Sequence, residues 1–480
     1  MPGMGTPELP VPDGLVLRPF RGVRFTVDDP AKVTSPPYDL ISNGDVRALL
    51  DAHPNNVVRL ILPCTPRQVD QEQAGPPPTP PAGPPPAPVP PASPPAIHPA
   101  DAGRTSEPHD EPHRAEKYGP ARDTLRAWLS SGVLVRDERP ALYAYEQSGP
   151  GVLQRGLIGD IGLADPAQGV ILPHEDVFPG PVADRLALMS TTQANLEPIF
   201  LLYDGDHGTA TRLVEEVATT RPPLVDARTD DGLTHRLWAI TDQAEIDAIN
   251  ADLRPRQALI ADGHHRYATY RVLQRQEHAS RTTPASPAGP PVGPWDFGLA
   301  LLVDSTAYPP DLKAIHRVIP GLPLREAAAR AKGAWQVHDH PTLADGLAAL
   351  DAAPEPAFLL AGAGGSHLLT DPDPVQLAHA MPADRSERWN SLNTSILTCF
   401  VMPKVWGMQD DEQAVRIVHH DAQAATDLAV RSDGTAVILK PLAVEDVLAV
   451  AAAGERVPRK STSFGPKPRT GLLLRTFAAE

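Results

Sequence analysis

Short apolar runs alternate with amphipathic stretches along most of this chain. Runs of this length between turn residues predict buried strands, here at residues 56–62, 141–145, 156–161, 199–203, 258–261 and 297–303. Apolar positions at helical spacing predict one helix over residues 118–131, where Leu125, Trp128 and Leu129 share a face, and another over residues 267–276. This order of strands and helices predicts an α/β or α+β fold.

The pattern changes in character after residue 320. It predicts alanine-rich helices and short strands in alternation, with helices at residues 324–334, 343–350 and 444–453 and strands at 357–360 and 435–439. We therefore divide the chain into a flexible N-terminus, a core domain, a second α/β lobe and a basic segment that returns to the core, at residues 1–14, 15–320, 321–452 and 453–480.

Proline interrupts the core domain twice. Between Pro76 and Pro95, 13 of 20 residues are proline. Proline has no N–H donor and a fixed φ angle, so this stretch cannot form a helix or a sheet ladder. We expect disordered proline-rich inserts at residues 65–117 and 281–294, each within the domain rather than between two domains.

The bulk composition narrows the class of protein. The chain has 480 residues, 41% of them hydrophobic, and a net charge of −16, which argues against nucleic acid as a partner. Its only cysteines, Cys64 and Cys399, exclude a disulfide framework and a thiolate-rich zinc site and suit a reducing compartment. Without a signal-peptide pattern or an 18-residue apolar run, we expect a cytoplasmic protein with no membrane partner.

The densest group of chemically active residues is the run from Asp262 to Arg266, Asp-Gly-His-His-Arg. It follows a predicted strand and opens a predicted helix, so Asp262 can cap the helix and Gly263 lets a ligand approach the backbone. The first-turn amides would then bind an anion, with Arg266 available to a phosphate. An ordinary helix cap with two packed histidines fits the same run.

Two further segments carry candidate groups. His174 and Glu175 follow an apolar run, and a carboxylate beside a histidine suits a general base or a magnesium ligand, with Arg185 and Asn195 placed to orient a substrate. Residues 454–468 concentrate four cations, Arg456, Arg459, Lys460 and Lys467, as an anion-binding loop would. A solvated loop and a solvated basic tail are the alternatives. The triplet at residues 419–421, His-His-Asp, lacks a second ligand cluster at a diagnostic spacing, so we expect a structural or surface role there.

Together these segments resemble a prokaryotic family catalogued as domain of unknown function 1015. The resemblance rests on ordered landmarks at residues 17–24, 35–39, 132–134, 174–175, 195–200, 230–238, 261–266 and 454–462. One departure is the ending Phe464-Gly465-Pro466-Lys467, where the family resemblance implies an aromatic residue followed by Tyr-Pro-Lys.

The Asp-Gly-His-His-Arg run is also similar to the signature of the ParB-like fold, and especially of the free serine kinases. That resemblance implies a ParB-like core in which Glu175 is the general base on a substrate hydroxyl and Asp262 serves magnesium or the substrate. It also implies that Gly263, His265 and Arg266 hold nucleotide phosphates, with His264 as a third catalytic candidate beside Glu175 and Asp262. Substrate contacts are expected from His174, Arg185 and Asn195, and secondary contacts from Arg18, Tyr38, Asp39, Arg456 and Lys460.

Three functions stay open at this point. The first is a nucleotide-dependent phosphotransferase that uses Mg²⁺ with ADP or ATP and acts on a small hydroxylated metabolite such as free serine. It requires that Glu175 and residues 262–266 line one pocket. The second is a non-catalytic nucleotide-binding regulator without a carboxylate near the terminal phosphate. The third is a phosphoester hydrolase with histidines as general acid and base.

Overall fold

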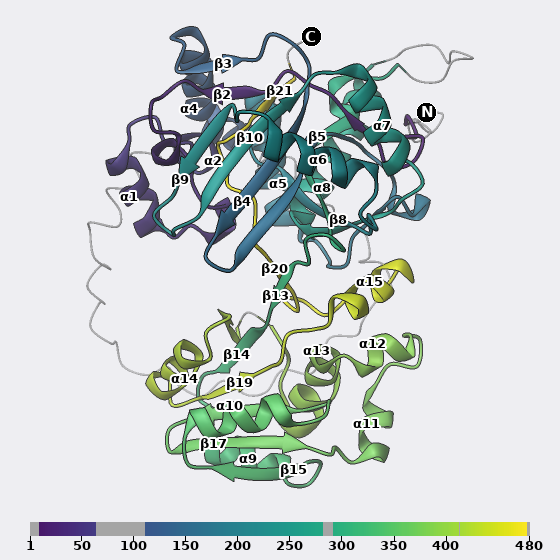
Figure 1. Ribbon diagram of the computed structural model, residues 1–480. Coiled ribbons are helices and arrows are strands. Elements are labelled where there is room, and N and C mark those ends of the chain that lie inside the picture. The colour runs from purple at the N-terminus through teal and green to yellow at the C-terminus, as the bar shows by residue number, and fades with distance from the viewer. Residues whose placement is uncertain (1–8, 64–110, 282–290, 412, 478–480) are drawn as a thin grey trace, which may run out of the picture.

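Two β-sheets organise the chain into a larger and a smaller body, and Figure 1 shows the larger body above the smaller one. The structure is a computed structural model that describes residues 9–63, 111–281, 291–411 and 413–477. The larger body holds a mixed nine-stranded sheet and the smaller body an antiparallel six-stranded sheet. The protein is therefore of mixed α/β class, as the sequence pattern predicts.

The larger sheet is built around long central strands. Its order is β6 (Ile171–Leu172), β11 (Ala258–Asp262), β8 (Ile199–Tyr203), β12 (Phe297–Asp304), β5 (Val152–Gly162), β4 (Leu142–Gly149), β10 (Thr234–Ile240) and β9 (Val225–Arg228), while β1 (Leu17–Arg18) also pairs with β5. The β11–β6 and β12–β8 pairs are parallel, and the others are antiparallel. The strands predicted at 141–145, 156–161, 199–203, 258–261 and 297–303 all lie in this sheet.

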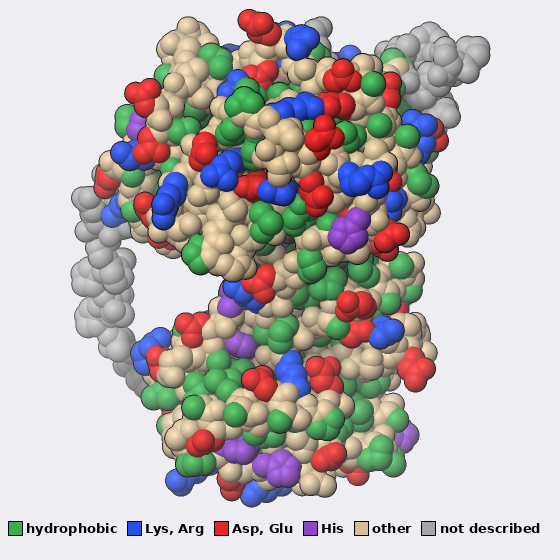
Figure 2. Space-filling model, viewed as in Figure 1, with side chains coloured by type: hydrophobic (Ala, Val, Ile, Leu, Met, Phe, Trp, Pro, Cys, Tyr) green, Lys and Arg blue, Asp and Glu red, His purple; other side chains and the backbone are tan. Residues whose placement is uncertain are grey.

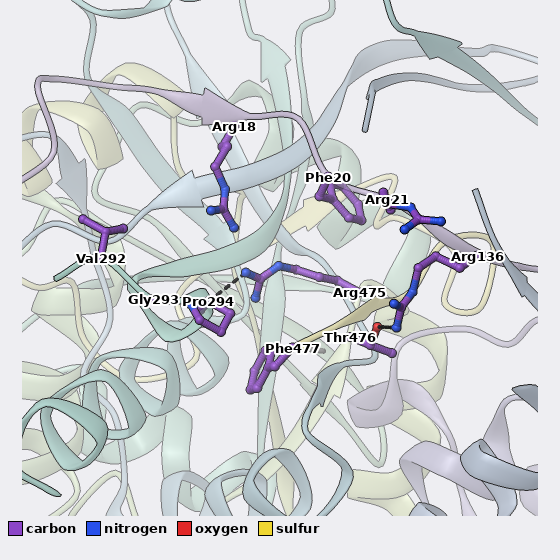
Figure 3. A pocket seen from close by; sticks show the side chains of 10 residues that line it. All are labelled: Arg18, Phe20, Arg21, Arg136, Val292, Gly293, Pro294, Arg475, Thr476 and Phe477. Carbon is purple, nitrogen blue, oxygen red and sulfur yellow. Dashed lines mark hydrogen bonds between the residues drawn. The ribbon is translucent and has the colours of Figure 1, made fainter. Parts of the chain in front are cut away.

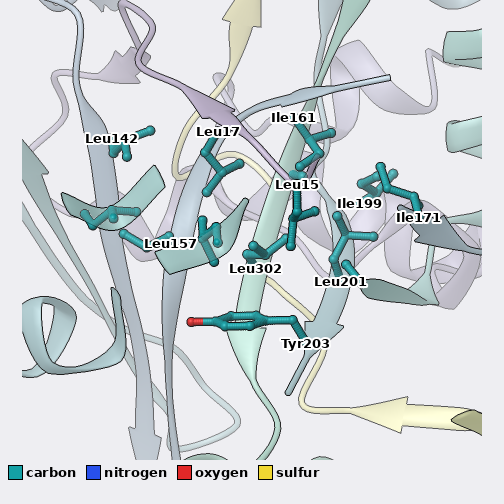
Figure 4. Close-up of a cluster of buried hydrophobic side chains, with 14 of the residues drawn as sticks. Leu15, Leu17, Leu142, Leu157, Ile161, Ile171, Ile199, Leu201, Tyr203 and Leu302 are labelled. Carbon is teal, nitrogen blue, oxygen red and sulfur yellow. The ribbon is translucent and has the colours of Figure 1, made fainter. Parts of the chain in front are cut away.

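Both faces of the larger sheet are buried, because side chains of a strand alternate between its faces and both sets are apolar. From β8, Ile199, Leu201 and Tyr203 join a core with helices α6 (Thr209–Thr220), α7 (Gln243–Leu253) and α8 (His264–Ser280), part of which Figure 4 shows. Phe200 and Leu202 join a second core, against α15 (Val444–Ala452) and the C-terminal part of the chain. The sheet is thus the middle layer of this body.

A helical cap packs beside the larger sheet. It comprises α1 (Asn43–Ala52), α2 (Val58–Ile61) and α4 (Glu111–Ser130), packed with α5 (Pro179–Thr192) and the small sheet of β2 (Val23–Phe25) and β3 (Leu134–Arg136). The strand expected at residues 56–62 is wrong, because α2 occupies this run. Asn56 turns the chain there, since its side chain donates to the carbonyls of Lys32 and Thr34 and accepts the N–H of Val58. A short, wholly apolar run does not separate helix from strand by its pattern alone.

Most of the proline-rich segments cannot be compared with the structure. Residues 65–110 of the first insert and 282–290 of the second lie outside the described residues. Helix α4 begins at Glu111, within the first predicted insert, and a 3₁₀ turn, η5 (Pro294–Asp296), closes the second.

The smaller body repeats the same layering. Its strand order is β15 (Gln336–His340), β17 (Gly365–Thr370), β16 (Phe358–Gly362), β19 (Thr435–Ile438), β14 (Ile315–Ile319) and β18 (Arg416–His419). Phe358 and Leu360 pack on one face with α9 (Leu324–Ala331) and the π-helical segment η6 (Leu397–Val405), while Leu359 and Ala361 pack with α10 (Leu343–Ala352) and α14 (Ala422–Arg431). Three short helices lie beside them, α11 (Pro374–Ala380), α12 (Glu387–Ser391) and α13 (Asn393–Ile396). Strand β14 precedes residue 321, so this sheet begins before the predicted domain boundary, and the boundaries stay a prediction.

The chain crosses between the bodies twice, side by side. Strand β13 (Asp311–Lys313) leads into the smaller body and pairs with β20 (Ser463–Gly465), which leads back. We call residues 456–469 the return segment. Beyond it, β21 (Arg475–Thr476) pairs with β7 (Ala194–Asn195) in the larger body. On the face in Figure 2 the molecule narrows between the bodies, and acidic and basic side chains are intermixed over both. In the described part of the chain, no helix has the length and apolar character that a membrane span requires.

Candidate functional site

A cavity of about 480 Å³ lies where β11 ends and α8 begins. Such a volume is in the range of small-molecule sites. Six parts of the chain meet around it: the turn after β11, the loop after β6, the first half of α5, the 3₁₀ turn η2 (Tyr38–Leu40), the return segment, and strands β14 and β18 of the smaller body. Its lining residues with reactive or charged groups are Tyr38, Asp39, Glu175, Asp184, Arg185, Asp262, His264, His265, Arg266, His419, Lys460, Thr462, Ser463 and Lys467.

The turn from β11 into α8 depends on Gly263. Its φ angle is +94°, in the left-handed region, and a Cβ there would stand 3.0 Å from Cγ2 of Ile199 and 3.2 Å from Nε of Arg266. Gly263 itself is the N-cap residue and no side chain caps the helix, so the expectation that Asp262 caps it is wrong. The N–H groups of His264 to Arg266 therefore lack helical partners at the positive end of α8. This is a place where an anion binds well.

The carboxylate of Asp262 is held between two cations. Its Oδ2 lies 2.5 Å from Nη2 of Arg266, and its Oδ1 lies 2.5 Å from Nζ of Lys467. The same Lys467 ammonium lies 3.0 Å from Oδ2 of Asp39. Burial disfavours the charge of Lys467, but the carboxylates of Asp262 and Asp39 outweigh it and raise the pKa of the lysine. The return segment is thereby tied to the turn after β11 and to η2.

Arg266 is a positioning residue in this arrangement. Besides Asp262, its guanidinium donates to the carbonyl of Pro198 at 2.5 Å, and its Nε is buried without a partner among the described residues. Burial opposes its charge, but Asp262, Glu197 and Asp39 raise its pKa. Arg266 therefore stays charged, with one contact to the protein from each of Nη1 and Nη2. Its predicted grip on a phosphate stays a prediction.

Glu175 is a half-buried carboxyl on the wall of the cavity. Burial raises its pKa, a nearby Asp262 adds to that, and a hydrogen bond from the hydroxyl of Thr462, 3.0 Å long, acts in the opposite direction. The same hydroxyl lies 2.8 Å from Nε2 of His174. Because Thr462 donates to Glu175, it accepts from His174, which fixes the proton of that imidazole on Nε2.

The two histidines of the turn have their Nε2 lone pairs occupied. Nε2 of His264 accepts the N–H of His174 at 3.3 Å, and Nε2 of His265 accepts the N–H of Phe178 at 3.1 Å. Burial lowers the pKa of both rings. A neutral imidazole whose Nε2 accepts carries its proton on Nδ1. Each ring can therefore donate a hydrogen bond to an anion but is poorly placed to accept a proton.

A layer of buried charge supports the opposite wall. The guanidinium of Arg185 lies 4.5 Å from the centre of the Tyr38 ring and pairs with Asp184 at 2.7 Å. It also donates to the carbonyl of Ile61. Glu197, buried below, accepts the N–H of Tyr38 at 3.0 Å, and burial raises its pKa although Arg266 and Arg185 counteract this. Arg185 therefore lines the cavity with its charge largely committed to the protein.

The structure separates four predicted residues from this cavity. Arg18 pairs with Asp160 elsewhere in the larger body. Asn195 accepts a hydrogen bond from Arg475 at 2.9 Å, away from the site. His174 is fully buried behind the cavity wall, and Arg456 lines a neighbouring hollow beside Phe178 and Tyr267. Direct substrate contacts by Asn195 and His174 thus do not follow from this arrangement, and the prediction that all front and back motifs converge on one site is only partly met.

Five of these reactive or charged lining residues were not among the predicted site residues: Asp184, His419, Thr462, Ser463 and Lys467. The sequence pattern marks Lys467 only as one cation of a basic run, and His419 only as part of a His-His-Asp triplet with an expected structural or surface role. Burial lowers the pKa of His419 to about 4, so its ring is neutral at neutral pH. The pairing of β13 with β20 and the contacts of Thr462 and Lys467 place the return segment against the turn after β11, and no local pattern signals them.

The arrangement does not fit a protein-held magnesium site. Among the described residues no three His, Cys, Asp or Glu side chains are grouped as metal ligands. Both oxygens of Asp262 already face cations, and the Lys467 ammonium stands between Asp262 and Asp39 where a bridging metal would be. Mg²⁺ is commonly held by one or two carboxylates with substrate phosphates. Asp262 as a metal ligand stays a prediction.

Comparison with known proteins gives a family and several similar solved structures. A family described as protein of unknown function (DUF1015) matches residues 17–76 and 96–395. Similar solved structures include SbnI with a C-terminal truncation from Staphylococcus aureus, with a TM-score of 0.32, 11% identity, and coverage of 64% of this chain and 82% of that one. A free serine kinase in complex with AMP has a TM-score of 0.31 and 13% identity, with coverage of 65% of this chain and 87% of that one. A mutant free serine kinase has also been solved with ADP. A conserved hypothetical protein from Pyrococcus furiosus has a TM-score of 0.32 and 13% identity, with coverage of 67% of this chain and 95% of that one. No curated protein matches the chain.

Proposed function

The chain belongs to the DUF1015 family, and from that premise we propose that it is a nucleotide-dependent phosphotransferase that phosphorylates a small hydroxylated metabolite. The class of acceptor, with free serine as the example, rests on the resemblance of the Asp262 to Arg266 run to the free serine kinases. The larger body would then be a ParB-like core. ADP or ATP would be the phosphoryl donor.

One observation carries the proposal: a helix start suited to an anion and a half-buried carboxylate line the same cavity. The unpaired amides of His264 to Arg266 offer donors to a phosphate, and Lys460 and Lys467 line the cavity beside them. Glu175 lines it as well. Phosphoryl transfer requires mainly such positioning and charge stabilisation.

Glu175 suits the role of general base. Burial raises its pKa towards neutrality, which makes its carboxylate a stronger base than an exposed glutamate. In the proposed step the acceptor hydroxyl gives its proton to Glu175 as its oxygen forms a bond to the terminal phosphorus. The bond from that phosphorus to the bridging oxygen of the nucleotide breaks, and that oxygen leaves with the remaining nucleotide.

The two alternative functions fit the cavity less well. A non-catalytic nucleotide-binding regulator needs no base, whereas Glu175 reaches the cavity with a raised pKa. A hydrolase with histidines as acid and base needs a free ring lone pair, but those at Nε2 of His264 and His265 accept backbone N–H groups. The transferase therefore has the strongest support from the geometry.

The first experiment is a thermal-shift screen with ADP and ATP, with and without magnesium. A ligand that binds only the folded chain raises its melting temperature. We expect a nucleotide-induced shift that is lost in Lys460→Gln, because Lys460 lines the cavity. Lys460 is exposed, so the substitution should leave the fold intact. Lys332→Gln, an exposed lysine outside the cavity, is the matched control. Equal shifts in both variants would show that the nucleotide does not bind in this cavity.

The second experiment follows labelled phosphate from the nucleotide to free serine or to water. Glu175→Gln should keep the nucleotide shift and lose transfer to the hydroxyl. Transfer to water alone would favour the hydrolase, and a nucleotide shift without any transfer across a panel of hydroxylated metabolites would favour the regulator.

A further inference from the structure

A second, smaller hollow in the larger body is walled by arginine. Its volume is about 140 Å³, and it shares no lining residue with the cavity described above. Figure 3 shows four arginine side chains around it, from the front of the chain (Arg18 and Arg21), from the end of β3 (Arg136) and from β21 (Arg475). The lining is completed by Phe20, Val292, Gly293, Pro294, Thr476 and Phe477, and it includes no carboxylate.

Two of the four arginines have structural partners. Asp160, whose side chain is fully buried, lies 3.0 Å from Nη2 of Arg18 and 2.5 Å from Nε of Arg475. Arg475 also donates to Asn195 at 2.9 Å and to the carbonyl of Pro294 at 2.7 Å. Asp160 therefore compensates one positive charge of the pair, and Arg475 is fixed at the base of the hollow with few donors to spare.

The other two arginines keep most of their donors free. Nε of Arg21 donates to the carbonyl of Asp137 at 2.8 Å, and Nη2 of Arg136 donates to the hydroxyl of Thr476 at 2.7 Å. In the described part of the chain neither guanidinium has a carboxylate partner. In addition, Nε of Arg18 is buried there without a hydrogen-bond partner. A guanidinium carries five N–H donors, so the hollow holds more donors than the protein satisfies.

Four guanidinium groups against one carboxylate is an unusual balance in a chain of net charge −16. Like charges brought together raise the energy of the fold unless an anion neutralises them. Arginine is the residue that best matches the planar oxygens of phosphate and carboxylate, through paired hydrogen bonds. The volume of the hollow suits a phosphate-sized group and excludes a whole nucleotide.

We propose that the hollow between Arg18, Arg21, Arg136 and Arg475 is a binding site for a phosphate-sized oxyanion, separate from the candidate catalytic cavity. Arg21 and Arg136 supply the direct contacts, while Asp160 holds Arg18 and Arg475 in place. The ligand is either inorganic phosphate or the phosphate group of a small monoester. Phe20 and Phe477, which line the hollow, would contact the carbon part of a monoester.

The test is calorimetric titration of inorganic phosphate, and separately of glycerol 3-phosphate, into the full chain at constant ionic strength. Arg21→Gln with Arg136→Gln should weaken binding at least about tenfold, since loss of one charge-assisted contact is worth about 1.4 kcal/mol. Arg126→Gln with Arg139→Gln makes the same change of net charge at exposed positions outside the hollow and should leave affinity unchanged. Tighter binding of the monoester would identify it as the ligand class.

A further variant separates this site from the proposed nucleotide site. Lys460→Gln should leave phosphate binding at the arginine hollow intact. No binding of either compound, or equal binding in the Arg21/Arg136 and Arg126/Arg139 variants, would overturn the proposal. Loss of binding in Lys460→Gln alone would assign the phosphate to the turn before α8 instead.

Discussion

Nζ of Lys467 lies 2.5 Å from Oδ1 of Asp262, which joins the return segment to the start of α8. The same ammonium lies 3.0 Å from Asp39. One side chain therefore holds together three segments that are far apart in the sequence. The side chains of Lys467 and Asp262 are largely shielded from solvent, whereas that of Asp39 is exposed.

Loss of Lys467 should destabilise the protein. Lys467→Gln leaves the carboxylates of Asp262 and Asp39 without their shared cation. Breaking a fully buried ion pair from one side costs about 3 kcal/mol, and this partly buried pair should cost less. Urea unfolding measures the change. In Asp262→Asn with Lys467→Gln, the loss should be smaller than the sum of the single losses, because the two residues interact directly. Additive losses would mean that the pair contributes no coupling.

Gly263→Ala should weaken both the fold and nucleotide binding. An alanine at a left-handed φ costs about 1–2 kcal/mol, and the new methyl group would press on Ile199 and Arg266, at 3.0 and 3.2 Å. Gly132→Ala is the matched control, because its φ is +77° and a Cβ there meets nothing within 4 Å. We expect the control to lose stability only, in thermal unfolding, and to keep any nucleotide-induced shift. Equal effects of the two substitutions would show that the close approach of the new methyl group to Ile199 and Arg266 affects neither stability nor nucleotide binding.

Glu175→Gln should stabilise the protein at neutral pH while it abolishes phosphoryl transfer. Burial raises the pKa of Glu175 in the folded state, so its contribution to stability is complete below the unfolded pKa and is lost as the pH rises through the folded pKa. The amide of glutamine removes that loss. Melting temperatures at about pH 4 and about pH 8 should therefore differ less in the variant than in the original chain. The exposed Glu138→Gln is the control and should change neither profile nor activity.

His174 should contribute to acid unfolding. Burial lowers the pKa of its ring from 6.5 to about 3, so the stability of the neutral ring is present above pH 6.5 and is lost as the pH falls towards 3. His174→Gln keeps a donor for Thr462 but does not titrate. Urea unfolding over this range should show a shallower decline in the variant. An unchanged decline would assign acid sensitivity to other buried groups, such as His235, whose pKa burial lowers to about 4.

The sequence by itself determined the class of fold and the centre of the candidate site. Continuous apolar runs place strands such as β8 and β12 in the middle of a sheet, because both faces of these strands must be buried. A glycine followed by two histidines and an arginine at the start of a helix marks a candidate anion-binding turn, because helix amides and glycine backbone freedom are local properties. Glu175 is a candidate general base for a similar local reason, because it lies beside a histidine after an apolar run.

Only the tertiary structure decided which distant groups meet. The ion pairs of Lys467 depend on strands β13 and β20 lying together, and the four arginines of the second hollow come from segments near both ends and from the middle of the chain. It also decided that residues 58–61 form a helix, since Asn56 finds its hydrogen-bond partners near residue 33. Periodicity describes the neighbours of a residue along one element. Contacts between elements depend on packing and burial across the whole chain, which no local pattern contains.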